Sequence, residues 1–331
     1  MEPKRIREAA ELREAAELVL PWLPPADLAA AATACKLFNT IATAITTRRS
    51  ADAARGLERY PIPFSNPIDS QPYSYFLYSR SAILRSPSSQ PWGGTAGAPL
   101  SDPSSFSDLA SVAIGSGSGC QCRVCDPDGC PCWITDSDSG AGMGLLRECG
   151  FGCGCGSDCG NRATQLGVRI RVKVVKDPKK GWGLHADQFV KKGSFICEYA
   201  GEYLTTEEAR KRQKSYDELA RSKMKFSPAV IVVREHLPSG KACLRVNIDA
   251  TKVGNVARFI NHSCDGGNLI AVLVRNSGSM LPRLCFFAAI DLMQDQELTF
   301  SYGDVTRVKV DAFPCFCGTD ACLGVLPSEE T

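Results

Sequence analysis

Apolar residues near the start of the chain recur at helical spacing. Four of them lie three or four positions apart, separated by Arg and Glu: Ala9, Leu12, Ala16 and Val19. This spacing predicts a helix over 7–20, which Pro21, Pro24 and Pro25 end. Asp27 is expected to cap a second helix, whose apolar stripe comprises Leu28, Ala31, Cys35, Phe38, Ala42 and Ile45. Residues 1–60 are therefore predicted to form a helical segment.

Beyond Cys159 the pattern changes to short β-branched and aromatic runs separated by turn residues. Such runs predict strands, here at Val168–Val175, Phe195–Tyr199, Val230–Val233, Leu244–Ile248 and Leu284–Ala289. One long polar stretch, Glu207–Lys225, has helical character. The predicted fold class is α+β, mainly β, with a small helical segment at the N-terminus.

Between these regions, residues 61–119 have a different composition. They hold 8 Pro, 15 Ser and 6 Gly, which make up 29 of 59 residues. This composition predicts a linker without a fold of its own. One apolar and aromatic island interrupts it and is expected to pack on a neighbouring domain: Tyr73, Tyr75, Phe76, Leu77, Tyr78, Ile83 and Leu84.

Length and charge narrow the function classes. A chain of 331 residues suggests two domains or one large one. The net charge of +2 gives no global attraction to nucleic acid, so direct sequence-specific nucleic-acid binding is not expected. No run approaches about 18 consecutive apolar residues, and the charged start is not a signal peptide. A membrane partner is therefore not expected.

Cysteine is the outlier of the composition. Of 17 cysteines, nine lie in one short, Gly-rich stretch: Cys120, Cys122, Cys125, Cys130, Cys132, Cys149, Cys153, Cys155 and Cys159. Thiolates one to four residues apart suit tetrahedral zinc. Nine thiolates satisfy three zinc ions if three sulfurs bridge, since six single and three double contacts make twelve. The alternatives are a disulfide knot, or two mononuclear sites with a spare thiol.

A second cysteine set lies near the C-terminus. Cys315, Cys317 and Cys322 leave a tetrahedral zinc site one ligand short, and Cys264 is the candidate for the fourth. The remaining four cysteines stand in apolar runs and are interpreted as buried free thiols: Cys35, Cys197, Cys243 and Cys285.

Three further motifs complete the pattern. They are Gly181-Trp182-Gly183-Leu184, Arg258-Phe259-Ile260-Asn261-His262-Ser263-Cys264 and Glu297-Leu298-Thr299-Phe300-Ser301-Tyr302-Gly303. Together with the flanking cysteines, the chain resembles SET-domain lysine methyltransferases of the Su(var) class, in particular the short plant Su(var)-related proteins. The resemblance implies a pre-SET zinc cluster at 120–163, a SET catalytic domain with a pseudoknot at 164–304, and a post-SET zinc segment at 305–331.

The resemblance also implies a cofactor and a reaction. Members of the family transfer a methyl group from S-adenosylmethionine (SAM) to a lysine of histone H3, and the pre-SET class points to lysine nine. The cofactor-binding positions would be Gly181, Trp182, Gly183, Asn261, His262 and Tyr302. Gly181 and Gly183 let the backbone approach the cofactor closely. The zinc content would be three ions in the pre-SET cluster and one in the post-SET segment.

Three aromatic residues are the catalytic candidates. Tyr302 is expected to orient the target amine and the transferring methyl group, with Tyr199 as a second channel tyrosine. A strand-core aromatic is the alternative interpretation of Tyr199. Phe300 stands where a Tyr in the family restricts the product to monomethyl-lysine. A Phe there predicts that dimethylation and trimethylation are allowed.

Two departures from the family pattern concern the cofactor pocket. Ser301 replaces the usual Asp, and the segment after the polar helix offers Phe226 as its aromatic. Phe316 is a further lid candidate. Cofactor affinity is expected to be weak unless Phe226 substitutes for the missing aromatic.

The expected partner is the histone H3 tail on the nucleosome, with a nuclear, chromatin location. Residues 285–331 hold eight acidic and two basic residues, and an acidic surface there would attract a basic tail. Leu20 to Phe38 loosely resembles an F-box, which would dock a ubiquitin-ligase adaptor. A non-histone lysine methyltransferase, or a non-catalytic chromatin-binding SET protein, remains the alternative.

Overall fold

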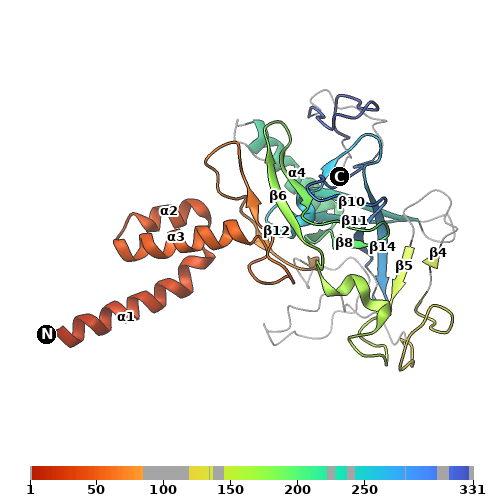
Figure 1. Ribbon diagram of the computed structural model, residues 1–331, viewed down its shortest axis with the longest axis horizontal. Coiled ribbons are helices and arrows are strands. Elements are labelled where there is room, and N and C mark those ends of the chain that lie inside the picture. The colour runs from red at the N-terminus through yellow and green to blue at the C-terminus, as the bar shows by residue number, and fades with distance from the viewer. Residues whose placement is uncertain are drawn as a thin grey trace.

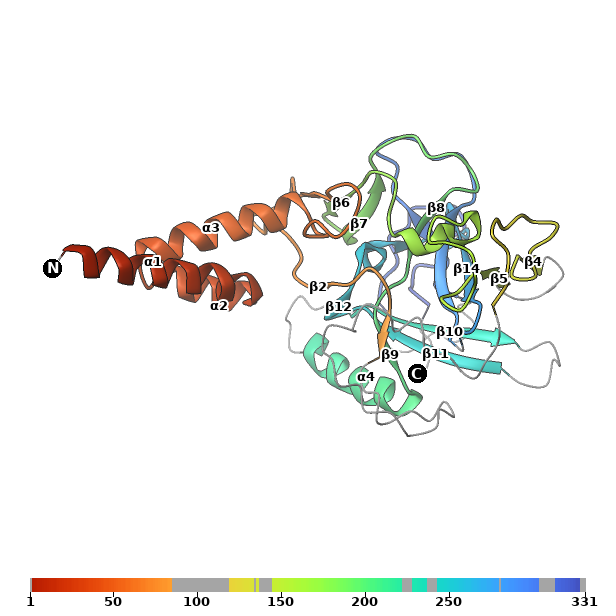
Figure 2. The ribbon, with the colours of Figure 1, turned by 90° about the horizontal axis from the view of Figure 1, so that it is seen from below.

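A β-rich body carries a projecting helical arm in the computed structural model (Figures 1 and 2). The structure describes residues 2–84, 119–133, 135–136, 145–221, 228–236, 243–279, 281–303 and 313–327. The arm contains the N-terminus and points away from the body in both views. None of the helices in these residues has the length and apolar character needed to cross a membrane.

The arm consists of α1 (Glu2–Val19), the 3-10 turn η1 (Leu20–Trp22), α2 (Pro25–Ala32) and α3 (Lys36–Ala51). The expected second helix is thus two helices. The chain breaks at Cys35, whose backbone is extended and whose Sγ accepts from the Phe38 N–H at 3.5 Å. Asp27 lies inside the first turn of α2 after Pro25, so it is not the cap that we predicted. Cys35 is exposed rather than buried.

A small apolar core holds the arm together, and one arginine fixes it to the body. The core residues are Ala16, Leu20, Leu28, Ile41, Ala42 and Ile45. At the end of α3 the buried Arg49 guanidinium donates to the carbonyls of Pro21 and Leu23 and to the Tyr73 hydroxyl. The same cation lies 4.9 Å from the centre of the Tyr75 ring. The arm therefore joins the body through the buried Arg49 side chain, whose cation is held by hydrogen bonds and by an aromatic ring.

Among the described residues, three sheets of three to five strands and two two-stranded sheets form the body. The first has the order β1 (Phe64–Ser65), β6 (Val172–Asp177) and β7 (Gly181–Ala186). The second has the order β10 (Val230–His236), β11 (Cys243–Asp249), β9 (Glu202–Leu204) and β3 (Ile83–Leu84). The third has the order β4 (Thr135–Asp136), β5 (Leu145–Glu148), β14 (Leu269–Asn276), β15 (Arg283–Ala288) and β8 (Phe195–Glu198).

The aromatic island of the expected linker packs on the body, as predicted, with Phe76 inside the main core and Tyr78 and Leu84 packed against it. The part of the linker over 61–84, however, is not unstructured. It supplies β1, β3 and β2 (Leu77–Tyr78), which pair with β6, β9 and β12 (Val253–Gly254) respectively. Its partners lie more than 90 residues further along the chain, so local composition could not reveal them. Residues 85–118 lie outside the described residues.

The predicted strands are present with boundaries shifted by a few residues, and α4 (Thr206–Arg221) is the predicted polar helix. The strand β14, which pairs with both β5 and β15, was not predicted. Cys197 and Cys285 are buried, as predicted, whereas Cys243 on β11 is exposed.

The short strands β13 (Asn261–His262) and β16 (Thr299–Phe300) pair in parallel with a register of Asn261 to Thr299. They follow η6 (Val256–Phe259). Parallel neighbours need a long connection between them, and here it includes β14 and β15. This crossing places the second and third sequence motifs side by side.

The segment with the nine clustered cysteines joins the sheets through β5 and the irregular η5 (Gly160–Leu166). Arg283 on β15 donates to Glu148 at 3.0 Å and to Glu198 at 3.2 Å, and all three side chains are buried. One buried cation thus joins Glu148, next to the cysteine cluster, with Glu198 on β8.

Candidate functional site

At the β13–β16 crossing, Asn261 meets the Gly-Trp-Gly motif of β7. Its Nδ2 donates to Glu297 Oε1 at 2.9 Å and to the Trp182 carbonyl at 3.4 Å. A Cβ on Gly183 would lie 3.0 Å from Glu297 Oε1 and 3.1 Å from Asn261 Nδ2. Gly181 has a φ of +81°, which favours glycine. Gly181 is therefore favoured by its backbone conformation, and Gly183 by the lack of room beside Asn261 and Glu297.

Glu297 is a site residue that the sequence reasoning did not single out, although it opens the third motif. Its Oε2 accepts from Lys180 Nζ at 2.6 Å, while Oε1 holds Asn261. The carboxylate therefore links the residue before Gly181 with the crossing strand. The signal that could have identified it is an acidic residue within a motif already chosen for its chemistry.

His262 connects Tyr302 with the C-terminal cysteines. Its Nδ1 accepts from the backbone N–H of Tyr302 at 3.1 Å, and its Nε2 lies 3.2 Å from Cys264 Sγ. Burial lowers the pKa of His262 below its usual value. A neutral ring that accepts at Nδ1 carries its proton on Nε2, so the ring donates toward the Cys264 sulfur.

The three catalytic candidates belong to one group of neighbouring rings, in which Tyr199 contacts Phe286 at 6.4 Å between centroids. The Phe300 ring lies 4.7 Å from Phe286 and 5.0 Å from Tyr302, measured between centroids. The Tyr302 hydroxyl donates to the Ile260 carbonyl at 2.8 Å, and the Tyr199 hydroxyl donates to the Ala229 carbonyl at 3.1 Å. Burial raises the pKa of both phenols, so both stay protonated at neutral pH.

Exposure separates the two tyrosines. Tyr199 is buried, with 6% of its surface accessible, whereas 36% of the Tyr302 surface is accessible. Tyr302 thus has its hydroxyl held from inside while part of its ring remains open. A hydroxyl fixed in this way offers an oriented oxygen to a ligand without needing to reorganise.

The residues that depart from the family pattern, and the lid candidate Phe316, lie in different surroundings. Phe226 lies in 222–227, outside the described residues. Ser301 is exposed, and its Oγ lies 3.4 Å from the Gly303 carbonyl. Phe316 is 43% exposed. Of the residues expected to make an acidic surface, Asp304, Asp311, Glu329 and Glu330 also lie outside the described residues.

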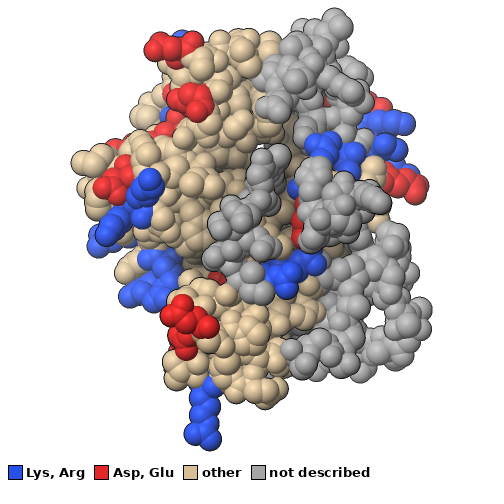
Figure 3. Space-filling model, turned by 90° about the vertical axis from the view of Figure 1, so that its right-hand side faces the viewer, with Lys and Arg blue, Asp and Glu red and all other residues tan. Residues whose placement is uncertain are grey.

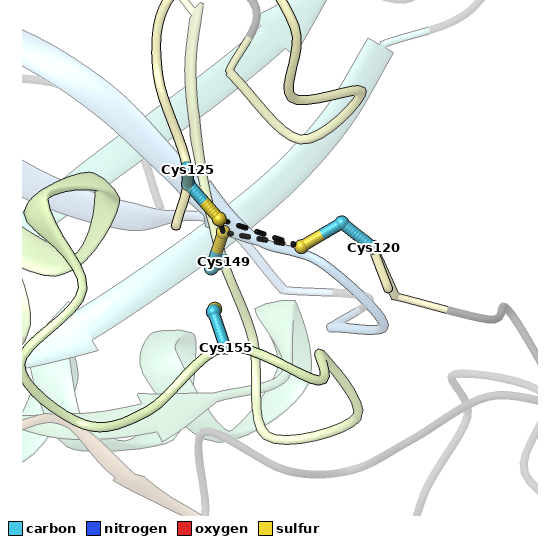
Figure 4. Close-up of side chains that lie close together, drawn as sticks. All are labelled: Cys120, Cys125, Cys149 and Cys155. Atoms are coloured by element: carbon cyan, nitrogen blue, oxygen red, sulfur yellow. Dashed lines mark hydrogen bonds between the residues drawn. The ribbon is translucent and has the colours of Figure 1, made fainter. Parts of the chain in front are cut away.

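The first cysteine cluster centres on a triangle of three sulfurs (Figure 4). Cys120 Sγ lies 3.6 Å from Cys125 and 3.8 Å from Cys149, and Cys125 lies 3.7 Å from Cys149. Their side chains point toward one another from separate stretches of chain, with Cys155 next to them. None of the 17 cysteines is in a disulfide.

Around this triangle the sulfurs group in fours, each within 4.8 Å. The three groups are Cys120, Cys125, Cys149 and Cys155; Cys120, Cys132, Cys149 and Cys153; and Cys120, Cys122, Cys125 and Cys130. Cys120 belongs to all three, and Cys125 and Cys149 each belong to two. Cys159 is adjacent, since it interacts with both Cys125 and Cys155. Such sets of soft thiols are the donors that zinc prefers.

The second cluster brings together Cys264, Cys315, Cys317 and Cys322, whose sulfurs lie within 4.8 Å of one another. Cys264 lies two residues after β13, and the other three come from the C-terminal segment. These residues have the number and type of ligands for one structural zinc ion.

Charge on the face of Figure 3 is mixed. Lys and Arg lie interspersed with Asp and Glu among the residues that are described there. The described residues of this face therefore form no extended patch of one sign, in keeping with the small net charge of the chain.

Comparisons with known proteins identify this arrangement. The SET domain family model matches residues 181–303. The histone-lysine N-methyltransferase SUVR3 of Arabidopsis thaliana is 53% identical over 332 residues, which is 96% of this chain and 91% of that protein.

Two solved structures are also similar. The methyltransferase domain of human SETMAR has a TM-score of 0.61 at 30% identity, covering 84% of this chain and 97% of that one. KRYPTONITE, solved with mCHH DNA, an H3(1–15) peptide and SAH, has a TM-score of 0.58 at 27% identity. That match covers 83% of this chain and 53% of KRYPTONITE.

Proposed function

Because the chain belongs to the SET-domain histone-lysine methyltransferases of the Su(var) class, we propose that it methylates histone H3 at lysine nine with SAM as donor. The observation that carries this proposal is the β13–β16 crossing, which places Asn261 and His262 beside both the Gly-Trp-Gly turn and Tyr302. The peptide and SAH in the KRYPTONITE structure support the same substrate and donor.

The cofactor would lie against the backbone of Gly181–Gly183 and Asn261, where the missing Cβ of Gly181 leaves open space. SAM supplies an electrophilic methyl group on a positively charged sulfur. Asn261, held by Glu297, offers a carbonyl oxygen of fixed direction. Glu297 itself is neutralised by Lys180, so the pair adds little net charge at the site.

Tyr302 and Tyr199 would line the channel for the target amine. A lysine amine has a pKa near ~10.4 and attacks only as the neutral base. A dry aromatic channel lowers that pKa, because desolvation penalises the ammonium form. Holding the amine in line with the methyl group can lower the barrier by roughly 7–11 kcal/mol. The Tyr302 hydroxyl, fixed by the Ile260 carbonyl, is suited to that orientation.

We also propose the metal content. The nine cysteines of the cluster would hold three zinc ions, with Cys120, Cys125 and Cys149 as shared ligands, because each belongs to more than one group of four. The other six cysteines of the cluster would bind singly. A fourth zinc would join Cys264 to the C-terminal segment. The pre-SET, SET and post-SET segments would then be 120–163, 164–304 and 305–331.

The test is methyl transfer from labelled SAM to recombinant H3 and to nucleosomes, with zinc supplied and the modified lysine mapped by peptide sequencing. Tyr302→Phe should reduce transfer at least about 100-fold through loss of orientation. Tyr203→Phe is the matched control, since its buried hydroxyl donates to the Pro282 carbonyl. Label on another lysine would refute the lysine-nine assignment. No label on any histone, with folded zinc-loaded protein, would favour a non-histone substrate or a non-catalytic role.

We also propose that the N-terminal arm binds a ubiquitin-ligase adaptor. Its helices have a core of their own, as an adaptor-binding module would need. Co-purification of a ubiquitin-ligase adaptor with residues 1–60 present, and its loss when they are removed, would support the F-box interpretation.

A further inference from the structure

We propose that Phe64, which lies outside the matched SET region, is a positioning residue of the cofactor site. Its ring braces two motifs at once, the Gly-Trp-Gly turn through Trp182 and the crossing strand through Phe259. The inference rests on the proposed function, because it assigns cofactor binding to those two motifs. It makes a segment that resembles a linker in composition part of the catalytic apparatus.

Two aromatic contacts of Phe64 are with the two motifs, and a further one is with Tyr73, at 6.3 Å between centroids. The Phe64 ring centroid lies 5.2 Å from that of Trp182 at an angle of 76°, and 5.9 Å from that of Phe259 at 86°. The contacts with the motifs are both edge-to-face arrangements, each of which stabilises aromatic pairs beyond the burial of area. Phe64 is half-buried and packs on the main core.

Each of the two contacted motif residues is directly connected to Asn261. The Trp182 carbonyl accepts from Asn261 Nδ2 at 3.4 Å. Phe259 precedes Asn261 by two residues, and η6 ends there. A shift of either ring therefore moves the backbone that would face the cofactor from both sides.

Phe64 is itself held in place. Its strand pairs in parallel with β6, opposite Val174, and β6 pairs with β7. Lys176 donates to Asp69 at 2.6 Å and to Gln71 at 2.8 Å, and its Nζ lies 5.3 Å from the Trp182 ring centre. The Trp182 ring thus contacts a cation and an aromatic ring, and both belong to the same assembly of β1 and β6.

The experiment compares Phe64→Ala with Phe195→Ala in the full-length chain. Phe195 is a suitable control, because it is also half-buried on a strand and its aromatic partner is Phe287, at 5.5 Å. Two properties are measured for each variant. The first is use of the cofactor, from the SAH dissociation constant, the SAM KM and kcat. The second is backbone hydrogen exchange without cofactor.

Phe64→Ala should raise the SAH dissociation constant and the SAM KM about tenfold, equivalent to about 1.4 kcal/mol, while kcat at saturating SAM changes less than about twofold. Exchange should accelerate in peptides that contain Gly181–Gly183 and Phe259–Asn261. Phe64→Leu should lie between wild type and Phe64→Ala, and Phe195→Ala should change neither property.

Equal effects of Phe64→Ala and Phe195→Ala on SAH affinity would overturn the inference. So would unchanged exchange at both motifs. If wild type itself bound no SAH, the proposed cofactor would be wrong. Faster exchange at both motifs in Phe64→Ala alone would then still support bracing by Phe64.

Discussion

The backbone N–H of Tyr302 donates to Nδ1 of His262 across 3.1 Å. The other nitrogen of the same ring lies 3.2 Å from the sulfur of Cys264. One imidazole therefore connects Tyr302, the catalytic candidate, with the cysteine that would bind the post-SET zinc. Groups that hydrogen-bond a metal ligand also orient it.

His262→Ala should lower kcat and weaken zinc retention at the post-SET site, each about 10–100-fold, the usual cost of losing such an outer partner. Activity is measured with labelled SAM, and zinc release with a colorimetric chelator. The control is His185→Ala, since His185 is half-buried and bonds the Asp295 carbonyl at 3.0 Å. Equal effects of the two substitutions would argue against a specific link.

Phe300→Tyr should bias the product toward monomethyl-lysine. Phe300 is buried, with 5% of its surface accessible, and its ring lies between those of Phe286 and Tyr302. An added hydroxyl needs a polar partner there, and a water bound to it would occupy space for further methyl groups. Mass spectrometry of methylated H3 peptide gives the product ratio. Phe287→Tyr, on the half-exposed neighbour of Phe286, should leave that ratio unchanged.

Cys120→Ser should remove more than one zinc ion per chain, because Cys120 belongs to all three groups of four. Cys122 belongs to one group, so Cys122→Ser should remove at most one ion. Metal content is measured by mass spectrometry of purified protein, with four ions expected in the wild type. The same loss from both variants would contradict the bridging assignment. Since structural zinc contributes folding energy, Cys120→Ser should also unfold at lower temperature.

Arg283→Ala should destabilise the protein by about 3–5 kcal/mol, because it leaves Glu148 and Glu198 buried without their cation. The measurement is chemical denaturation with zinc present. Arg275→Ala is the control, since Arg275 is more exposed and pairs with Glu235. A cost for Arg283→Ala no greater than that for Arg275→Ala would mean that the network adds no stability.

Much of the site could be predicted from sequence because its chemistry is local. Closely spaced thiols indicate zinc without any knowledge of the fold, and the order of the three motifs indicates the family. The fold class and the enzyme class follow from them, and the comparisons confirm both. The predictions that proved wrong in the N-terminal arm concern residues whose role depends on where a helix ends. Cys35 was assigned to an apolar stripe, but its sulfur caps a new helix.

The segment 61–84 shows why local sequence could not predict the whole fold. Its Pro and Ser content describes a chain that forms no regular structure alone, and its short strands are stable only because partners distant in sequence pair with them. Such pairing carries no local signal, so Phe64 could not be connected with Trp182. Arg49 and Arg283 were missed for the same reason.

The sequence by itself determined which chemical groups the protein has: nine clustered thiols, a second cysteine set, and the Asn-His and Phe-Ser-Tyr motifs. Only the tertiary structure decided which of them meet. It selected Cys120, Cys125 and Cys149 as the central sulfurs and placed His262 between Tyr302 and Cys264. The physical reason is that spacing fixes neighbours along a strand or helix, whereas contacts across the β13–β16 crossing depend on how the whole chain folds back.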